Sequence, residues 1–267
     1  MANCNVSKET MKRLISDIKD ILKNPLTAHG IYYKHDETDM LKGKALIIGP
    51  KNTPYEDGFY FFKFEFPVNY PHAPPKVIYC TNDGHTRFNP NLYRCGKVCL
   101  SILNTWQGEP WSACQTITSI LLVLCTVLND KPLLNEPGVT IQHRDYNNYN
   151  KILKYKNIEV GILNMLENTT IQEEFTAFTE IMQTHFKINA TSIQQKIEEE
   201  INLNTANDAA ASAAALAVAA AGAAAVAAGA AAAATDNLVV TAVYQLRCNI
   251  NYKALYSKFK EINEKYS

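Results

Sequence analysis

The residues most able to do chemistry in this sequence are its cysteines. Seven occur, at positions 4, 80, 95, 99, 114, 125 and 248. Most cysteines are small buried hydrophobic residues, and we assign that role to Cys80, Cys125 and Cys248. A thiolate is also the nucleophile of covalent acyl transfer and a ligand of zinc. The odd count and irregular spacing are typical of a reduced intracellular protein rather than of a disulfide framework.

Cys99 is distinguished by its surroundings. It lies in the run GKVCLSIL, eight residues after Asn91 of the run FNPNLY and ahead of the pair Trp111-Ser112. Cys95 and Cys99 could form half of a zinc site, but a structural zinc needs four ligands and no second close pair follows. A metal site is therefore not predicted. A regulatory disulfide involving Cys95 and Cys114 stays open.

These motifs resemble the signature of the ubiquitin-conjugating enzymes. In that family a His-Pro-Asn triplet ends eight residues before a cysteine followed by leucine, and a Trp-Ser pair opens a later helix. Upstream, residues 54–59 (PYEDGF) match the family's turn between strands, and residues 66–77 match its proline-rich loop. The longer loop at residues 104–110 and the run NEPG at 135–138 are similar to a divergent branch, which includes the Z-type conjugating enzyme and the BRUCE conjugating domain. Members of that branch carry extra C-terminal helices.

The resemblance implies a role for each candidate site residue. Cys99 is the nucleophile that carries ubiquitin or a ubiquitin-like protein as a thioester. Asn91 donates to the oxyanion of the transfer step or braces the loop. Glu136 is the acidic residue that guides the incoming amine, with Asp130 as the second choice. The family's histidine is replaced by Asn89, which can make some of the same loop hydrogen bonds. No cofactor is implied, because ATP is used by the activating enzyme.

The resemblance also implies partners: a ubiquitin-like modifier, an activating enzyme, and a RING or HECT ligase. By position, the activating enzyme binds the first helix at Lys8 and Lys12. The ligase surface maps to three positions: His72, Trp111 and Ala113. Relatives often place a large apolar residue at the first and a proline at the last, so these departures favour an unusual ligase set or ligase-independent transfer.

Local patterning predicts the elements that position this site. Ser7 can cap a helix that runs to Lys23. Helical spacing predicts its inward face: Met11, Leu14, Ile15, Ile18 and Leu22. Its lysines lie on another face, which is either solvated or a docking surface. Strand-like runs over residues 31–35, 44–49, 59–66 and 76–81 predict an antiparallel meander. Ser112 and Gln115 can form a capping box for a buried helix over residues 117–128.

Together these features predict an α+β protein with the UBC fold: an N-terminal helix, a four-stranded antiparallel meander sheet, an active-site loop, a central buried helix and a C-terminal helical extension. Helices are expected over residues 147–167, 171–186 and 192–201. We expect a UBC core at residues 1–165, a helical extension at 166–205, an alanine-rich low-complexity insertion at 206–236, and a C-terminal helical segment at 237–267. The alanine run is long enough to span a bilayer, but alanine is only marginally hydrophobic and is the best helix former.

Composition limits the function classes. Lysine plus arginine and aspartate plus glutamate both number 26, so bulk neutralisation of nucleic-acid phosphates is not expected. The first 23 residues lack the apolar region of a signal peptide, which predicts a cytoplasmic or nuclear protein without membrane partners. Two alternatives to an active enzyme stay open: a non-catalytic module of the same fold that presents ubiquitin, and a membrane-anchored scaffold.

Overall fold

The computed structural model describes residues 6–221 and 237–266, with side chains described for 6–206 and 237–266. Its first element is helix α1 (Lys8–Lys23), where the Ser7 hydroxyl accepts a hydrogen bond from the amide of Thr10 at 3.0 Å. The predicted bounds are confirmed, and the predicted inward face is correct at Leu14 but wrong at Ile15 and Leu22. Ile15 and Leu22 are 41% and 74% exposed, and the buried positions are Thr10, Leu14, Asp17 and Ile21.

A buried carboxylate explains why the buried face of α1 differs from the face that its apolar residues predict. Asp17 accepts a hydrogen bond from Arg13 Nε at 2.8 Å and another from the Tyr70 hydroxyl. Because a buried charge is costly unless it is paired and hydrogen-bonded, these two partners allow Asp17 to face the core. Hydrophobic periodicity does not register such a contact.

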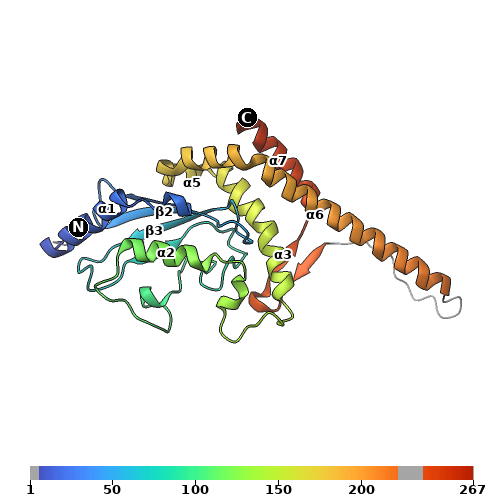
Figure 1. Cartoon of the computed structure of the whole chain (residues 1–267), viewed down its shortest axis with the longest axis horizontal. Helices are drawn as coiled ribbons and strands as arrows, with labels where there is room; N and C mark the ends of the chain where they lie inside the picture. The colour runs from blue at the N-terminus through green and yellow to red at the C-terminus, as the bar shows by residue number, and fades with distance from the viewer. Residues whose placement is uncertain (1–5, 222–236, 267) are drawn as a thin grey trace.

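Four strands form the sheet beside α1 (Figure 1): β1 (Ile31–His35), β2 (Lys42–Ile48), β3 (Phe59–Glu65) and β4 (Lys76–Tyr79). Their order β1-β2-β3-β4, with every pair antiparallel, confirms the predicted meander. The central strands are almost wholly buried. The turn between β2 and β3 is tight, since a Cβ on Gly49 would lie 1.7 Å from the carbonyl oxygen of Tyr55.

Helix α2 (Ile117–Val127) is the predicted central helix, and it buries Ile117, Ile120, Leu121 and Leu124. Its capping box is made by Thr116 and Ser119 rather than by the predicted pair. Ser112 and Gln115 instead serve the preceding loop: the Ser112 hydroxyl accepts from the amide of residue 114 at 3.3 Å, and the Gln115 carbonyl accepts from a guanidinium on α1. Short 3₁₀ turns η2 (Ser101–Leu103) and η3 (Pro132–Asn135) flank the site.

The predicted helix over 147–167 appears as α3 (Tyr146–Lys156), the π-helix η4 (Asn157–Asn164) and α4 (Met165–Glu167) in direct succession. The side chain of Asn157 joins this helical run to the turn before β3. It accepts a hydrogen bond from the Tyr60 hydroxyl at 2.6 Å and donates to the carbonyl of Glu56 at 2.8 Å.

The two predicted helices over 171–186 and 192–201 have the wrong boundaries. The first is interrupted near residue 175, and no break separates it from the second. The chain forms α5 (Thr169–Glu174), η5 (Thr176–Phe178) and the single long helix α6 (Thr179–Ala221), which includes part of the alanine run. Phe175 and Phe178 turn inward on Phe61, with ring centroids 4.5 and 6.3 Å away, and this packing ends the first helix. The rest of the alanine-rich segment, residues 222–236, lies outside the described residues.

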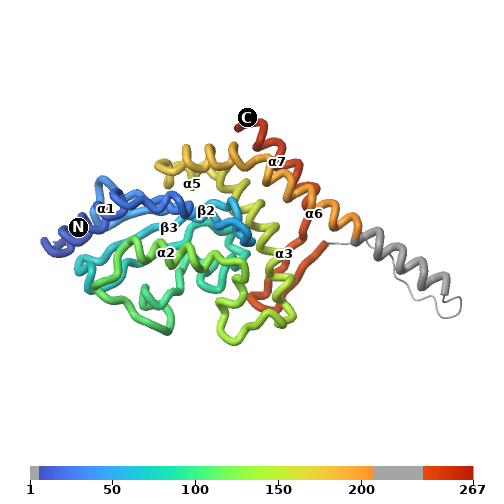
Figure 2. The backbone as a smooth tube through the Cα atoms, in the orientation of Figure 1, coloured from blue at the N-terminus to red at the C-terminus, as the bar shows by residue number. Residues whose placement is uncertain are grey.

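Strands open the last predicted segment, residues 237–267, which is not helical throughout. Strands β5 (Leu238–Val240) and β6 (Arg247–Asn249) pair, with η6 (Val243–Gln245) between them, before helix α7 (Tyr252–Tyr266). In Figures 1 and 2 this segment comes back beside α3, and α7 then lies along α6. The boundaries predicted between domains at residues 165, 205 and 236 stay predictions.

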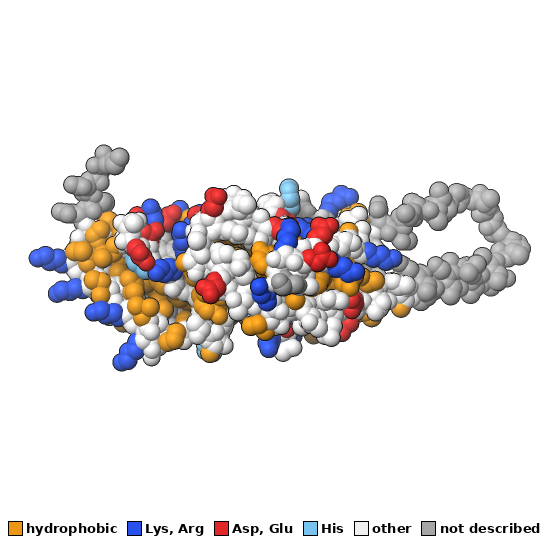
Figure 3. Space-filling model, turned by 90° about the horizontal axis from the view of Figure 1, so that it is seen from above, with side chains coloured by type: hydrophobic (Ala, Val, Ile, Leu, Met, Phe, Trp, Pro, Cys, Tyr) orange, Lys and Arg blue, Asp and Glu red, His pale blue; other side chains and the backbone are white. Residues whose placement is uncertain are grey.

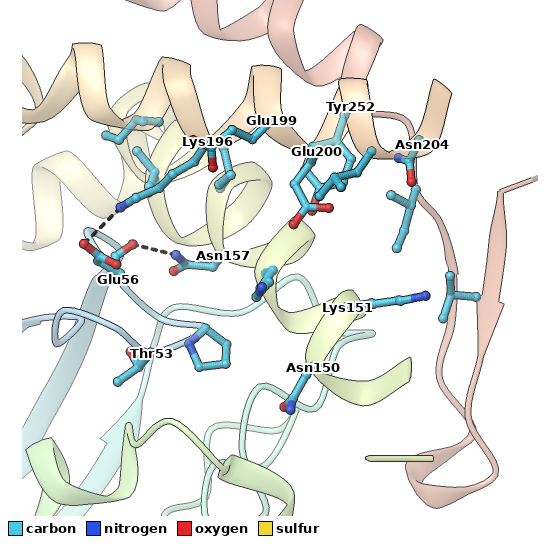
Figure 4. Close-up of a pocket in the computed structure, with 18 of the residues that line it drawn as sticks. Thr53, Glu56, Asn150, Lys151, Asn157, Lys196, Glu199, Glu200, Asn204 and Tyr252 are labelled. Carbon is cyan, nitrogen blue, oxygen red and sulfur yellow. Dashed lines mark hydrogen bonds and ion pairs between the residues drawn. The ribbon is translucent and has the colours of Figure 1, made fainter. Parts of the chain in front are cut away.

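Ion pairs fasten α6 to the same turn before β3. Lys196 Nζ lies 2.9 Å from Asp57 Oδ2 and 3.0 Å from Glu56 Oε1, and His185 Nε2 lies 3.0 Å from Asp57 Oδ1. Figure 4 shows Lys196 reaching from α6 toward Glu56, with Asn157 on its other side. The extension is therefore joined to the core by specific contacts. Within the described parts of the chain, no helix is long and apolar enough to cross a membrane.

Candidate active site around Cys99

The backbone around Cys99 is held by the segment that carries Asn91. The Cys99 amide donates to the Asn91 carbonyl at 2.9 Å, and the Asn91 side-chain amide donates back to the Cys99 carbonyl at 2.8 Å. Two isolated bridges, Leu92 with Val98 and Ile78 with Lys97, extend this pairing toward β4. The eight-residue spacing seen in the sequence is thus the spacing of a tight reciprocal pair.

The Cys99 thiol is closed off. The residue is only 2% exposed, and its Sγ donates to the carbonyl oxygen of Thr105 at 2.9 Å. Thr105 is fixed in turn, because its hydroxyl donates to the Val98 carbonyl and accepts from the Leu100 amide, both at 2.9 Å. Attack on a thioester requires an accessible thiol, so the described conformation is one in which the loop has closed over Cys99.

Asn89 is the centre of the loop's hydrogen bonds and is fully buried. Its amide donates to the Tyr55 hydroxyl at 2.9 Å and to the Val127 carbonyl at 2.7 Å. Its oxygen accepts from the amide of Asn91 at 2.9 Å and from the side chain of Asn135 at 3.3 Å. The asparagine that stands in place of the family's histidine therefore ties the loop to the β2–β3 turn, α2 and η3.

Glu136 and Asp130 differ sharply in position. Glu136 lines a cavity of about 140 Å³ together with Asn91, Cys99 and Trp106. The Asp130 side chain is 62% exposed, and it lines a different and larger hollow beside α6. Of the two predicted acidic residues, the structure brings only Glu136 to the nucleophile.

Three residues of this cavity were not predicted as site residues, although Tyr93 belongs to the run FNPNLY. They are Arg87, Tyr93 and Tyr244. The guanidinium carbon of Arg87 lies 3.3 Å from the ring centroid of Tyr93 and 4.8 Å from that of Tyr244. Burial, and then the hydrogen bond that the Tyr244 hydroxyl donates to Glu136, raise the pKa of Tyr244 well above its ordinary value.

The basic residues predicted to bind the activating enzyme lie at one end of the molecule. Lys8 and Lys12 are both exposed on α1, beside Pro71 of the proline-rich loop. Figure 3 shows several Lys and Arg side chains projecting at this end, among hydrophobic atoms. His72 is exposed on the same loop, with Nε2 3.2 Å from Glu9 Oε1. These residues are thus free to meet a partner surface.

The two remaining partner positions differ in exposure. Ala113 is exposed, and its carbonyl accepts a hydrogen bond from Arg13 at 2.6 Å, which ties this loop to α1. Trp111 is only 8% exposed, and its indole nitrogen donates to the Pro71 carbonyl at 2.6 Å. Trp111 therefore joins the two loops that are expected to meet a ligase, instead of presenting its own ring.

Of the other described cysteines, Cys248 is buried, Cys80 and Cys125 are half-buried, and two are exposed. Burial raises the pKa of Cys80 and Cys248 to about 11, which keeps both as neutral thiols. Burial raises the pKa of Cys125 as well. Cys95 and Cys114 are exposed and free. Among the described residues, no group of three or more His, Cys, Asp or Glu side chains is arranged to hold a metal ion.

The match to known families agrees with this geometry. The model of the family "Ubiquitin-conjugating enzyme" matches residues 13–160, more than half of the chain, and this range includes Asn91, Cys99 and Glu136. The chain belongs to the ubiquitin-conjugating enzyme family, as its motifs and its fold predict.

Individual relatives place it nearer one branch. It is similar to ubiquitin-conjugating enzyme E2 Z from Xenopus tropicalis (42% identical over 168 residues, 62% of this chain and 53% of that protein) and from Homo sapiens (43% over 162 residues, 60% and 45%). A longer match, 33% over 209 residues, covers 75% of this chain and 29% of probable ubiquitin-conjugating enzyme protein 17 from Caenorhabditis elegans. The predicted resemblance to the Z-type enzyme is confirmed, and the chain spans about half the length of those E2 Z relatives.

Proposed function

We propose that this protein is an active conjugating enzyme that takes ubiquitin or a ubiquitin-like protein from an activating enzyme onto Cys99 and passes it to an amine or to a ligase cysteine. The reciprocal pair of hydrogen bonds between Asn91 and Cys99 carries the proposal, because it holds the backbone of the nucleophile at the wall of the cavity that both residues line. Cytosol or nucleus is the proposed location.

The first step is thioester exchange. The Cys99 thiolate attacks the carbonyl carbon of the activating enzyme's thioester, the new carbon–sulfur bond forms, and the old one breaks to release the activating enzyme's thiolate. Before this step, the hydrogen bond that Cys99 Sγ donates to the Thr105 carbonyl must break. No cofactor of this chain takes part, since ATP is consumed before the transfer.

The second step is attack by an amine. Nitrogen adds to the thioester carbonyl, and the oxyanion collapses with Cys99 thiolate as the leaving group. The nitrogen's proton passes to Glu136 or to water. In the described state the Asn91 amide is already engaged with the Cys99 carbonyl, which supports its role as a brace of the loop. That brace fixes the place where negative charge develops.

The proposed partner surfaces are assigned to the predicted partner positions that are exposed. Lys8 and Lys12 form the basic face for the activating enzyme, while His72 and Ala113 lie on the two loops for a RING or HECT ligase. Arg13 holds the second of these loops against α1.

A charging assay tests the proposal. The protein is incubated with an activating enzyme, ATP and ubiquitin, and a band that disappears with thiol reductant is expected. Cys99→Ala removes that band, whereas Cys95→Ala, at an exposed thiol four residues away, keeps it. If the wild-type chain stays uncharged with ubiquitin and with several ubiquitin-like proteins and their activating enzymes, the enzyme assignment is wrong, and the alternative of a non-catalytic presenting module is favoured.

The role of Asn91 is tested in the second step. Asn91→Ala is expected to charge nearly as fast as the wild type but to discharge to free lysine about 100-fold more slowly, because without the brace the place where the oxyanion develops is no longer fixed. Equal discharge rates would remove Asn91 from the functional residues.

A further inference from the structure

Tyr244 reaches the active site from the far end of the chain, through the turn between β5 and β6. This turn is internally fixed, because the Thr241 amide donates to the Leu246 carbonyl at 3.0 Å and the Thr241 hydroxyl donates to the Val243 carbonyl at 2.7 Å. Its position beside α3 is visible in Figure 1. The turn is therefore a formed element that can place a side chain.

Asp145, at the start of α3, fastens this turn to the core. Its Oδ2 accepts hydrogen bonds from the amides of Ala242 and Val243 at 2.9 and 2.8 Å. Asp145 is 6% exposed. Charge-assisted hydrogen bonds to backbone amides are among the stronger ones in proteins. The Asp145 carboxylate therefore fixes the position of the backbone directly before Tyr244.

The backbone of Tyr244 is held in an unusual conformation. Its φ is 59° and that of Gln245 is 51°, both in the left-handed region that non-glycine residues seldom adopt. Such residues persist where the surroundings fix them, and they gather at functional sites. Here the surroundings include Arg94, whose guanidinium donates to the Tyr244 carbonyl.

The side chain of Tyr244 contacts two parts of the active site at once. Its hydroxyl donates to Glu136 Oε2, and its ring centroid lies 4.8 Å from the guanidinium carbon of Arg87. Arg87 in turn donates to the carbonyls of Asn89 at 3.0 Å and Pro90 at 2.6 Å, in the loop that carries Asn91. The tyrosine thus holds both the acidic residue and the loop.

We infer that Tyr244 is a positioning residue for the aminolysis step, which fixes the Glu136 carboxylate so that its second oxygen faces the incoming amine beside Cys99. The C-terminal extension therefore completes the acceptor side of the active site. This inference rests on the proposed function. It assigns no covalent step to Tyr244, whose phenol keeps its proton and acts only through Glu136 and Arg87.

The test separates charging from discharge. Wild type and Tyr244→Phe are charged with ubiquitin, the ATP is removed, and loss of the thioester is followed against free lysine over a range of concentrations. Tyr244→Phe keeps the ring on Arg87 and loses only the hydroxyl. The lysine concentration for half-maximal discharge is expected to rise about 10-fold, the size of one hydrogen bond to a charged group, while charging slows far less. Tyr256→Phe is the matched control, because its hydroxyl also donates to a carboxylate, Glu198 at 2.7 Å, but on α7 against α6.

A double-mutant cycle with Glu136→Ala distinguishes positioning from a general structural role. If Tyr244 acts through Glu136, Tyr244→Phe causes no further change in lysine dependence when Glu136 is absent. Asp145→Ala, which releases the turn without touching the phenol, is expected to reproduce the Tyr244→Phe defect. Thermal melting of each variant shows whether the fold is intact.

The outcomes are separable from those of the proposed function. A wild-type chain that never charges refutes the proposed function. A wild type that charges and discharges, beside a Tyr244→Phe variant with unchanged lysine dependence, refutes the inference alone. The inference is also refuted if Tyr244→Phe slows charging and discharge equally, and by the same factor in the Glu136→Ala background. Such a result would mean that Tyr244 only supports the fold.

Discussion

Replacing Asn89 tests whether the loop around Cys99 is held mainly by one buried amide. Asn89→Ala deletes four hydrogen bonds. The partners of its two donor bonds keep other contacts: the Tyr55 hydroxyl still donates to the Phe88 carbonyl at 2.6 Å, and the Val127 carbonyl still accepts from Asn135 at 3.2 Å. The amide of Asn91 loses its acceptor.

The cost follows from that difference. Losing a bond whose partner retains another contact costs about 1 kcal/mol, and leaving a donor without an acceptor costs about 1–3 kcal/mol. Asn89→Ala is therefore expected to lower the free energy of unfolding by about 3–5 kcal/mol. For a protein of this size, that corresponds to a fall in Tm of about 10 °C.

The conservative replacement gives an internal scale. In Asn89→His, a neutral imidazole offers one N–H donor and one acceptor nitrogen, against two donors and one shared acceptor oxygen in the asparagine. It is expected to lose about half as much stability, roughly 2 kcal/mol. Asn24→Ala, at an exposed residue whose side chain makes a single hydrogen bond, to the Asp20 carboxylate, serves as the control and is expected to stay within about 1 kcal/mol of the wild type.

Urea unfolding followed by tryptophan fluorescence measures these differences, since Trp111 is buried in the folded protein and meets solvent on unfolding. Lysine discharge is then measured well below each Tm. A loss below about 1 kcal/mol for Asn89→Ala, or equal losses for the alanine and histidine variants, would refute the central role of this amide.

Two further predictions concern the turn before β3. Burial opposes ionisation of Asp57, but hydrogen bonds and charge from His185 and Lys196 outweigh it and hold the pKa of Asp57 below its ordinary value. The stabilising effect of the Asp57 carboxylate is therefore complete above about pH 4 and is lost as the pH falls further. Asp57→Asn should lower the free energy of unfolding by about 2 kcal/mol at pH 7 and by little at pH 2, as measured by urea unfolding at both values. Gly49→Ala should lower the free energy of unfolding by about 3 kcal/mol, because its Cβ would meet the backbone oxygen of Tyr55 at 1.7 Å, and an unchanged melting curve would contradict that contact.

The sequence predicted those features that are encoded locally. Strand residues such as those of β3 are β-branched or aromatic and are bounded by turns, so the meander could be read from short windows. Cys99 and Asn91 were paired through the resemblance of their motif, with its eight-residue step, to the family signature. The inward face of α1 could not be predicted from apolar spacing, since it depends on the contact of Asp17 with the distant Tyr70. The cap of α2 is local, because Thr116 and Ser119 are three residues apart, and it was predicted with the wrong pair.

Tyr244 marks the limit of prediction from the sequence. It is 108 residues from Glu136 along the chain, and it lies in a segment expected to be helical. Its place depends on Asp145 accepting two backbone hydrogen bonds. A single carboxylate in a polar stretch gives no pattern that distinguishes such an anchor from a solvated side chain.

The closed thiol and the proposed reaction are compatible on energetic grounds. The loop over Cys99 consists of residues 104–110, all of them exposed, so its displacement uncovers little apolar surface. Gly108 has a φ of 129°, which only glycine adopts readily, and Asn104 has a φ of 55° at the other end of the loop. The contacts that must break are the hydrogen bonds of Thr105: the one from Cys99 Sγ and those with Val98 and Leu100. Because the core beneath, including Asn91 and Asn89, stays paired, Cys99 can be exposed by local opening without unfolding of the sheet.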